Sequence, residues 1–215
     1  MKRELQALRP RVRKRKGEGG QRRTEILEAA KKLFVEEGYD ATTIRRIATR
    51  VGISSTALYV YFPNKNAVLT EICNETFARL IQELDAVRRD YSDSSDALAA
   101  ALQGYIRFGL AHSSEYQLTF LSRESTELHK QKQGDPALGM LAFERFYGCV
   151  DAVVRSGRTH ETDTNRLTQQ LWAGAHGLTT LLLLKPGLEW GDLDSLIAGH
   201  VAMLMRGLEK PQGRV

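Results

Sequence analysis

A chain of 215 residues with 42% hydrophobic and 27% charged residues has the composition of a globular protein and is long enough for one large or two small domains. No apolar run reaches the ~18 residues that span a membrane, and none follows the basic N-terminus early enough for a signal peptide, so no membrane partner is expected. The two cysteines, Cys73 and Cys149, lie far apart without metal-ligand spacing. They argue against a disulfide framework and favour a reducing, cytoplasmic location.

The charge is unevenly distributed along the chain. Residues 1–65 hold 16 Lys and Arg against 7 Asp and Glu, a net of +9, whereas residues 66–215 hold 15 against 19, a net of −4. A basic N-terminal third indicates that this end meets a polyanion. With only 5 prolines and few alternating segments, the chain predicts an all-α fold of about nine helices.

The chain begins with a basic segment that has no sustained apolar face. Residues 1–20 end in Gly-Glu-Gly-Gly and predict a flexible tail, which either contacts phosphates and a minor groove or remains solvated. A first helix is expected over residues 21–37, because Ile26, Ala29, Ala30, Leu33 and Phe34 form an apolar stripe that Gly38 ends.

Two short helices joined by a glycine turn are predicted next. In residues 43–51 the apolar side chains recur at i, i+3, i+4 and i+7, with Thr43 as N-cap and Gly52 after the last turn. Ser54 is a suitable N-cap for a second helix over residues 55–61, whose Leu58 points inward. This arrangement is a helix-turn-helix, in which the second helix enters the DNA major groove.

The same stretch resembles the DNA-binding signature of the TetR family of transcriptional repressors, T-x-x-x-I-A-x-x-x-G-[VI]-S-x-x-x-[LIV]-Y-x-[YH]-F-x-x-K. The positions in register are Thr43, Ile47, Ala48, Gly52, Ile53, Ser54, Leu58, Tyr59, Tyr61, Phe62 and Lys65. The similarity covers roughly residues 22–70. It implies a three-helix DNA-binding domain over residues 21–66 and a helical ligand-binding and dimerisation domain over residues 67–215.

The resemblance carries a set of candidate DNA contacts. Thr43 and Lys65 would approach phosphates at helix starts, and Tyr59 and Tyr61 the sugar-phosphate backbone. The recognition helix would read base edges with Ser55, Thr56 and Ala57 after its cap Ser54. Arg45 and Arg46 could read guanine, contact phosphate or simply face solvent, and Tyr59 could serve packing alone. The full set is Thr43, Arg45, Arg46, Ser54, Ser55, Thr56, Ala57, Tyr59, Tyr61 and Lys65.

The rest of the chain predicts a second helical domain. A helix over residues 65–89 would span roughly 37 Å and serve as a lever or a plain connector. The loop after Tyr91 offers Ser94 or Ser95 as the next N-cap. Residues 122–134 are polar and read as a loop or a helix extension. Five further helices are expected at residues 96–112, 114–121, 136–156, 163–184 and 193–208.

The helix over residues 163–184 contains a W-x-x-x-H-G sequence that resembles a C-terminal domain class of the same family. It implies a ligand pocket lined by Tyr105, Phe108, His112, Phe143, Tyr147, Trp172 and His176. The alternative is a core histidine satisfied by a neighbouring carbonyl, with Trp172 as packing. Gly174 and Gly177 suggest close helix approach. By resemblance, the last two helices of two chains form the dimer interface.

We therefore expect a homodimeric repressor that binds a near-palindromic double-stranded operator and is released by a small apolar effector. The alternative is a DNA-binding protein of the same fold without an effector. The five histidines have no metal spacing, and neither a phosphate-binding loop nor a nucleophile motif is present. No catalysis, metal or cofactor is expected.

Overall fold

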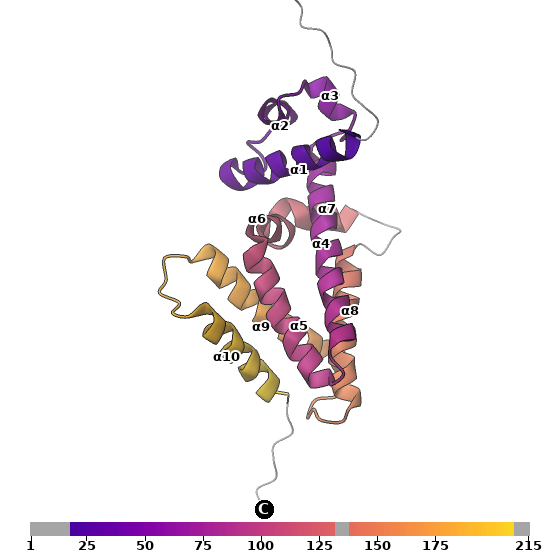
Figure 1. The fold of residues 1–215 in the computed structure, drawn as a ribbon, viewed down its shortest axis with the longest axis vertical. Helices are drawn as coiled ribbons and strands as arrows, with labels where there is room; N and C mark the ends of the chain where they lie inside the picture. Colours follow the sequence, from indigo (N-terminus) through magenta and orange to yellow (C-terminus); the bar gives the residue numbers. More distant parts are fainter. Residues whose placement is uncertain (1–17, 132–137, 209–215) are drawn as a thin grey trace, which may run out of the picture.

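The computed structural model describes residues 18–131 and 138–208, which form ten α-helices and one short π-helix without a β-strand. The predicted all-α class is confirmed. Helices α1 (Glu18–Glu37), α2 (Ile44–Val51) and α3 (Ser55–Tyr59) gather at one end of the molecule, and α4 (Lys65–Asp90) runs from them along its length (Figure 1).

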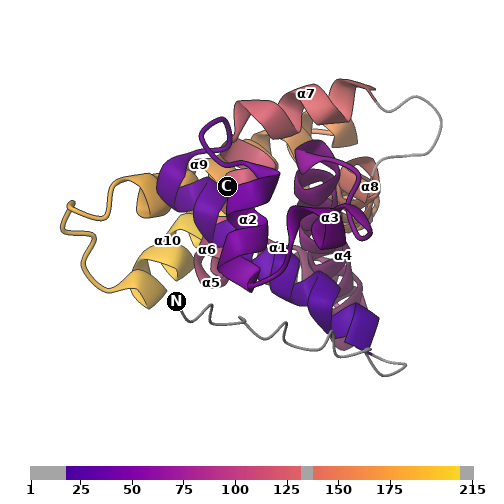
Figure 2. The same cartoon turned by 90° about the horizontal axis from the view of Figure 1, so that it is seen from above.

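The second domain is built around α4. It contains α5 (Ser94–Ala111), α6 (Ser113–Tyr116), the π-helix η1 (Gln117–Leu121), α7 (Arg123–Gln131), α8 (Leu138–Arg155), α9 (Thr164–Leu184) and α10 (Leu193–Arg206). Helix α4 packs on α5 and α8, and α5 packs on α9 and α10. In both views α10 lies on the side of the molecule opposite to α8 (Figures 1 and 2). None of the described helices is long and apolar enough to cross a bilayer.

Two hydrophobic cores correspond to the two domains. The first packs α1–α3 and the start of α4 around residues such as Ile26, Phe34 and Leu58, and it includes Leu118 of η1. The second packs α4, α5, α8, α9 and α10 around Leu98, Ile106 and Val150. The segment that holds α6 and η1 therefore contributes to both cores, since Tyr116 belongs to the second and Leu118 to the first.

The local signals of the helix-turn-helix are realised as expected. The Thr43 hydroxyl accepts from the Arg46 amide at 3.2 Å, and the Ser54 hydroxyl accepts from the Ala57 amide at 3.1 Å. Gly52 has a φ of 74°, which a residue without a Cβ adopts at no steric cost. Its N–H closes α2 onto Ala48 and Thr49, and this fixes the direction in which α3 leaves the turn.

Several boundaries differ from the prediction. Helix α1 begins at Glu18 rather than at residue 21, so part of the expected tail is helical, and residues 1–17 of that tail lie outside the described residues. The polar segment after η1 forms a separate helix, α7, which packs on α4 and η1 and raises the number of helices above nine. Asp93, rather than Ser94 or Ser95, caps α5, because its carboxylate accepts from two amides at 2.8 and 3.1 Å.

Of the two glycines predicted to allow close approach of helices, Gly174 does so within this chain and Gly177 does not. A Cβ on Gly174 would lie 2.9 Å from Leu204 Cδ2, which confirms a close approach of α9 and α10. A Cβ on Gly177 would meet no atom within 4 Å, so no close approach within this chain explains it. Sequence reasoning missed Gly109, where a Cβ would collide with Thr179 at the crossing of α5 and α9.

Candidate nucleic-acid interface and internal cavity

The outer face of the helix-turn-helix is formed by the exposed side of α3 and the residues that follow it. Thr56 is exposed and Ser55 and Ala57 are half-buried. Tyr59 is 53% and Val60 81% exposed, which makes Val60 the most exposed large hydrophobic side chain of the described residues. Sequence reasoning did not select Val60, because a valine between two aromatic residues looks like part of a core. The hydroxyls of Thr43 and Ser54 accept the N-cap hydrogen bonds of α2 and α3.

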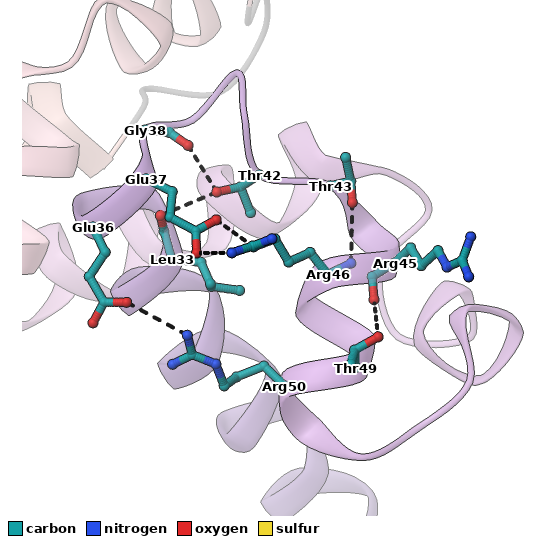
Figure 3. A network of polar contacts seen from close by, with 10 residues as sticks. All are labelled: Leu33, Glu36, Glu37, Gly38, Thr42, Thr43, Arg45, Arg46, Thr49 and Arg50. Carbon is teal, nitrogen blue, oxygen red and sulfur yellow. Dashed lines mark hydrogen bonds and ion pairs between the residues drawn. The ribbon is translucent and has the colours of Figure 1, made fainter.

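The three arginines of α2 differ in how they are held (Figure 3). Arg46 makes an ion pair with Glu37 at 2.5 Å, and Arg50 lies 3.6 Å from Glu36. Arg45 is exposed and points away from both pairs, and it has no ion pair among the described residues. Its guanidinium is therefore available to an external anion, whereas the other two arginines of α2 have carboxylate partners within the described residues.

Lys65 faces inward rather than outward. Its ammonium donates to the carbonyl of Tyr39 at 2.6 Å and to that of Asp40 at 3.4 Å, and it lies 4.0 Å from the centre of the Tyr39 ring. Burial, and then the charges of Glu124 and Asp40, raise the pKa of the Tyr39 phenol to about 12, so the ring stays neutral. Lys65 thus ties the start of α4 to the loop before α2.

Arg23 makes a similar brace. It donates to the Tyr61 carbonyl at 3.2 Å, pairs with Glu71 at 2.8 Å and lies over the Phe62 ring. Tyr61 itself is half-buried. Arg23 and Lys65 together join α1 and the loop before α2 to the start of α4, and so connect α4 directly to the reading head, which is formed by α1–α3.

Replacing Lys65 by alanine is expected to lower the free energy of unfolding by about 1–2 kcal/mol, because it removes a charged hydrogen bond and a cation–π contact. Denaturant unfolding of the variant measures the loss. Lys32→Ala, at an exposed position of α1, is the matched control and should change stability by less than about 0.5 kcal/mol. If the two variants were equally stable, the proposed role of Lys65 in bracing α4 would be contradicted.

The second domain contains a cavity of about 640 Å³ that is partly open to solvent and lies between α4, α5, α8 and α9, with η1 and α7 at one end. Its walls are mostly hydrocarbon and aromatic. The lining residues are Phe77, Leu80, Leu84, Leu102, Tyr105, Thr119, Phe120, Thr126, Gly139, Met140, Ala142, Phe143, Phe146, Trp172, Ala175 and His176. A space of this size and character suits a small organic ligand.

The structure brings four of the seven residues expected at a ligand pocket to this cavity. Tyr105, Phe143, Trp172 and His176 do line the cavity. Phe108, His112 and Tyr147 are not among the lining residues. Phe108 is buried in the core, with its ring 4.8 Å from that of His112, which caps the C-terminus of α5, and Tyr147 is half-buried one turn after Phe143 on α8. Sequence reasoning also missed Phe77, Phe120 and Phe146, because their helical spacing is the same for a filled core and for a cavity wall.

A hydrogen-bonded cluster lies at the wall formed by α5, α6 and α9. The Tyr116 hydroxyl is 2.6 Å from His176 Nδ1, the Tyr105 hydroxyl is 3.1 Å from the same nitrogen, and Trp172 Nε1 donates to the Tyr105 oxygen at 3.2 Å. Burial lowers the pKa of His176 and raises those of Tyr105 and Tyr116, so all three groups are neutral at pH 7. The partners of His176 Nδ1 are therefore two phenol oxygens rather than the carbonyl that the alternative expected.

The segment next to this cluster also reaches the DNA-binding end. Glu115 of α6 accepts from the ammonium of Lys31 on α1 at 2.9 Å, and Glu28 lies 2.5 Å from the same ammonium. Lys31 is only 3% exposed. Burial would lower its pKa, but the two carboxylates outweigh this and raise it. Adjacent residues, Glu115 and Tyr116, thus touch the reading head and the cavity wall respectively.

An outward-facing helix-turn-helix joined by one long helix to a domain with an internal cavity defines a DNA-binding regulator with room for a ligand. Comparison with known families agrees with this class. Residues 26–72 match the model described as bacterial regulatory proteins, tetR family, and residues 98–204 match the tetracyclin repressor-like C-terminal domain. The chain belongs to the TetR family of bacterial transcriptional regulators.

Two individual proteins are similar in sequence to parts of this chain. The uncharacterised HTH-type transcriptional regulator YuxN of Bacillus subtilis is 42% identical over 60 residues, which cover 26% of this chain and 21% of YuxN. The HTH-type transcriptional activator FasR of Mycolicibacterium smegmatis is 30% identical over 107 residues, which cover 50% of this chain and 49% of FasR. The matched regions therefore span at most about half the length of these two proteins.

The fold has solved counterparts. The crystal structure of a bacterial regulatory protein in the tetR family from Rhodococcus RHA1 superposes with a TM-score of 0.72 at 18% identity, over 89% of this chain and 99% of that one. At this identity the likeness concerns the fold alone.

Proposed function

We propose that this protein is a homodimeric, sequence-specific DNA-binding repressor that a small apolar effector releases from its operator. The observation that carries the proposal is that one chain holds an outward-facing recognition helix and a cavity of about 640 Å³, linked by α4. Members of this family commonly bind operator DNA as dimers and respond to small-molecule effectors. Cys73 and Cys149 are both buried and form no disulfide in the described structure, which accords with a cytoplasmic location.

The reading surface would be the outer side of α3. Thr56 and Ala57 would meet base edges, and the Val60 side chain is suited to a thymine methyl group. Arg45 would bind a phosphate or a guanine beside it, and the amides at the start of α2 would face a phosphate near Thr43. Tyr59 has an exposed hydroxyl-bearing ring for the sugar-phosphate backbone. For Lys65 the braced geometry favours a positioning role over a direct contact.

The dimer interface would be formed by α9 and α10. These helices and the loop between them, which holds Leu188, carry an exposed apolar set that a monomer rarely leaves in water: Leu181, Leu184, Leu188, Leu193 and Met203. Exposed Ala173, Ala198, Gly199 and Ala202 on the same two helices would let two chains approach closely. Gly177, which meets no neighbour in its own chain, is explained if a partner helix packs there. The paired heads would sit about 34–36 Å apart, one turn of DNA.

Release would follow from differential affinity of the effector for two arrangements of the dimer. Helix α4 carries Phe77, Leu80 and Leu84 of the cavity wall at one level and the brace to the reading head at its start. A ligand that presses on this wall would tilt α4 and change the spacing of the two heads. The alternative is a DNA-binding protein of the same fold without an effector, and it predicts a second domain filled by its own side chains. Because the domain instead holds a cavity, the ligand-responsive function is favoured.

The proposal is tested by selecting bound fragments from a random duplex library with the wild-type dimer, which should return a near-palindromic site. Arg45→Ala is then expected to weaken binding to that site about tenfold and to reduce the slope of log affinity against log salt by about one if the contact is to phosphate. Arg46→Ala is the matched control, because Glu37 already holds that guanidinium. No enriched site in the library would refute sequence-specific binding.

A further inference from the structure

The walls of the cavity restrict the chemistry of whatever fills it. Among the residues that the structure describes, none of those lining the cavity is Asp, Glu, Lys or Arg. Moving an ionised group from water into such a space costs several kcal/mol unless an opposite charge or a set of hydrogen bonds receives it. The cavity therefore disfavours a carboxylate, a phosphate or an ammonium group, and most of its wall can only contact hydrocarbon.

Two polar groups on the wall nevertheless lack partners. Thr119 is 4% exposed, and its Oγ1 has no hydrogen-bond partner among the described residues. His176 uses Nδ1 for the two tyrosine hydroxyls, and its Nε2 has no partner within the described part of the chain. We assign Tyr116 as the donor to Nδ1 of the neutral ring; this places the ring proton on Nε2 and makes Nε2 a donor for which the described residues supply no acceptor. A buried polar group without a partner, such as the Thr119 hydroxyl, is unfavourable, so a ligand that satisfies it gains affinity.

We infer that the effector is an uncharged, mostly hydrocarbon molecule with a hydroxyl or carbonyl group, which it places against the His176 side of the cavity. This inference rests on the proposed function, since it takes the cavity as the effector site. The oxygen of the ligand would accept from His176 Nε2. A hydroxyl would in addition supply a proton that Thr119 Oγ1 can accept. The aromatic rings of Phe77, Phe143 and Phe146 would surround the hydrocarbon part.

The test measures direct binding of four probes that share one chain type and differ in the head group: 1-dodecanol, 2-tridecanone, dodecanoate and dodecylammonium, each below its micelle concentration. Binding to the full-length protein without DNA is followed by tryptophan fluorescence, to which Trp172 in the cavity contributes, and by the rise in Tm. The alcohol and the ketone should bind at least about tenfold more tightly than either ion at pH 7. Equal or tighter binding of an ion, or binding of none of the four, overturns the inference.

Two variants locate the head group. His176→Phe keeps the ring volume and should lower the affinity for the alcohol about tenfold. Thr119→Val removes a hydroxyl that makes no hydrogen bond in the described structure, so it should fold like the wild type and lower the affinity for the alcohol about threefold. Phe143→Leu is the control and should weaken the alcohol and the ketone equally. Unchanged alcohol affinity in the Thr119 and His176 variants would place the head group elsewhere and overturn the assignment.

These results are separable from the test of the proposed function. Selection of a DNA site requires no ligand, and probe binding requires no DNA. Tight binding of the alcohol without release of DNA would count against the effector-controlled repressor but would leave the ligand chemistry standing.

Discussion

The double variant Leu181→Glu/Met203→Glu is expected to be monomeric and to lose about 100-fold or more of its affinity for the operator. Both side chains lie on the outward side of α9 and α10, and each is about half exposed in the single chain, at 48% and 53%. In a symmetric dimer, each introduced glutamate would face the same charge on the partner chain in place of an apolar contact. A monomer binds with a single DNA-binding domain and loses the gain in affinity that comes from linking two such domains. Sedimentation velocity measures the oligomeric state, and titration of a labelled operator measures the affinity.

The choice of positions separates association from folding. Leu204, one residue further along α10, packs on Gly174 of its own chain, so a charge there would disturb the monomer. Tyr91→Glu is the matched control, since Tyr91 is an exposed aromatic residue at the far end of α4 and outside α9 and α10. The control should remain dimeric. A double variant that remains dimeric at micromolar concentration would exclude this face as the interface.

The second large effect is expected from the buried pair that links α1 to α6. Glu115→Gln should lower the free energy of unfolding by about 3 kcal/mol, because it leaves the Lys31 ammonium buried beside only one carboxylate. Glu28→Gln removes the other, more exposed partner of the same lysine and should cost less than about 1 kcal/mol. The double variant Lys31→Met/Glu115→Leu should recover most of the loss, because the charges that lose a partner, those of Glu28 and Arg79, are on exposed side chains that water can solvate.

The dependence of this contribution on pH has a definite sign. Burial would raise the pKa of Glu115, but the hydrogen bond from Lys31 outweighs it and lowers the pKa. The stabilisation is therefore present above the unfolded pKa of the carboxyl and is lost as the pH falls through the folded one. The raised pKa of Lys31 places the other loss at alkaline pH, above its ordinary value of 10.5. In Glu115→Gln the acid-side decline should be shallower, and a slope equal to that of the wild type would contradict the pairing.

The Glu115 variant also examines communication between the two domains. Glu115 and Tyr116 are neighbours in α6, and they touch Lys31 of α1 and His176 of the cavity wall respectively. The link therefore needs no chain of intermediate residues, only a displacement of α6. If α6 carries the signal, an effector that releases the wild type should release Glu115→Gln less completely at saturating ligand, even where its affinity for the cavity is unchanged.

The helix-turn-helix could be predicted from the sequence because its determinants are local. The apolar period of α2, the caps Thr43 and Ser54 and the positive φ of Gly52 all act within four residues, so the sequence alone determined the class of fold and the position of the reading head. The charge of +9 in the first 65 residues agreed with it. Helix boundaries in the second domain were less accurate, since Ser94 and Asp93 are both good caps and only geometry selects one.

What only the tertiary structure decided are contacts between residues far apart in the chain. Lys65 has the sequence position of a phosphate ligand, yet its ammonium meets the Tyr39 carbonyl, 26 residues away. Lys31 and Glu115 are 84 residues apart, and each looks like an ordinary surface charge in its own helix. Phe77 and Phe146 have core spacing whether they meet another side chain or an empty space. Hydrophobic periodicity indicates which face of a helix is buried but not which residues it contacts. Those contacts are determined by the packing of the whole chain.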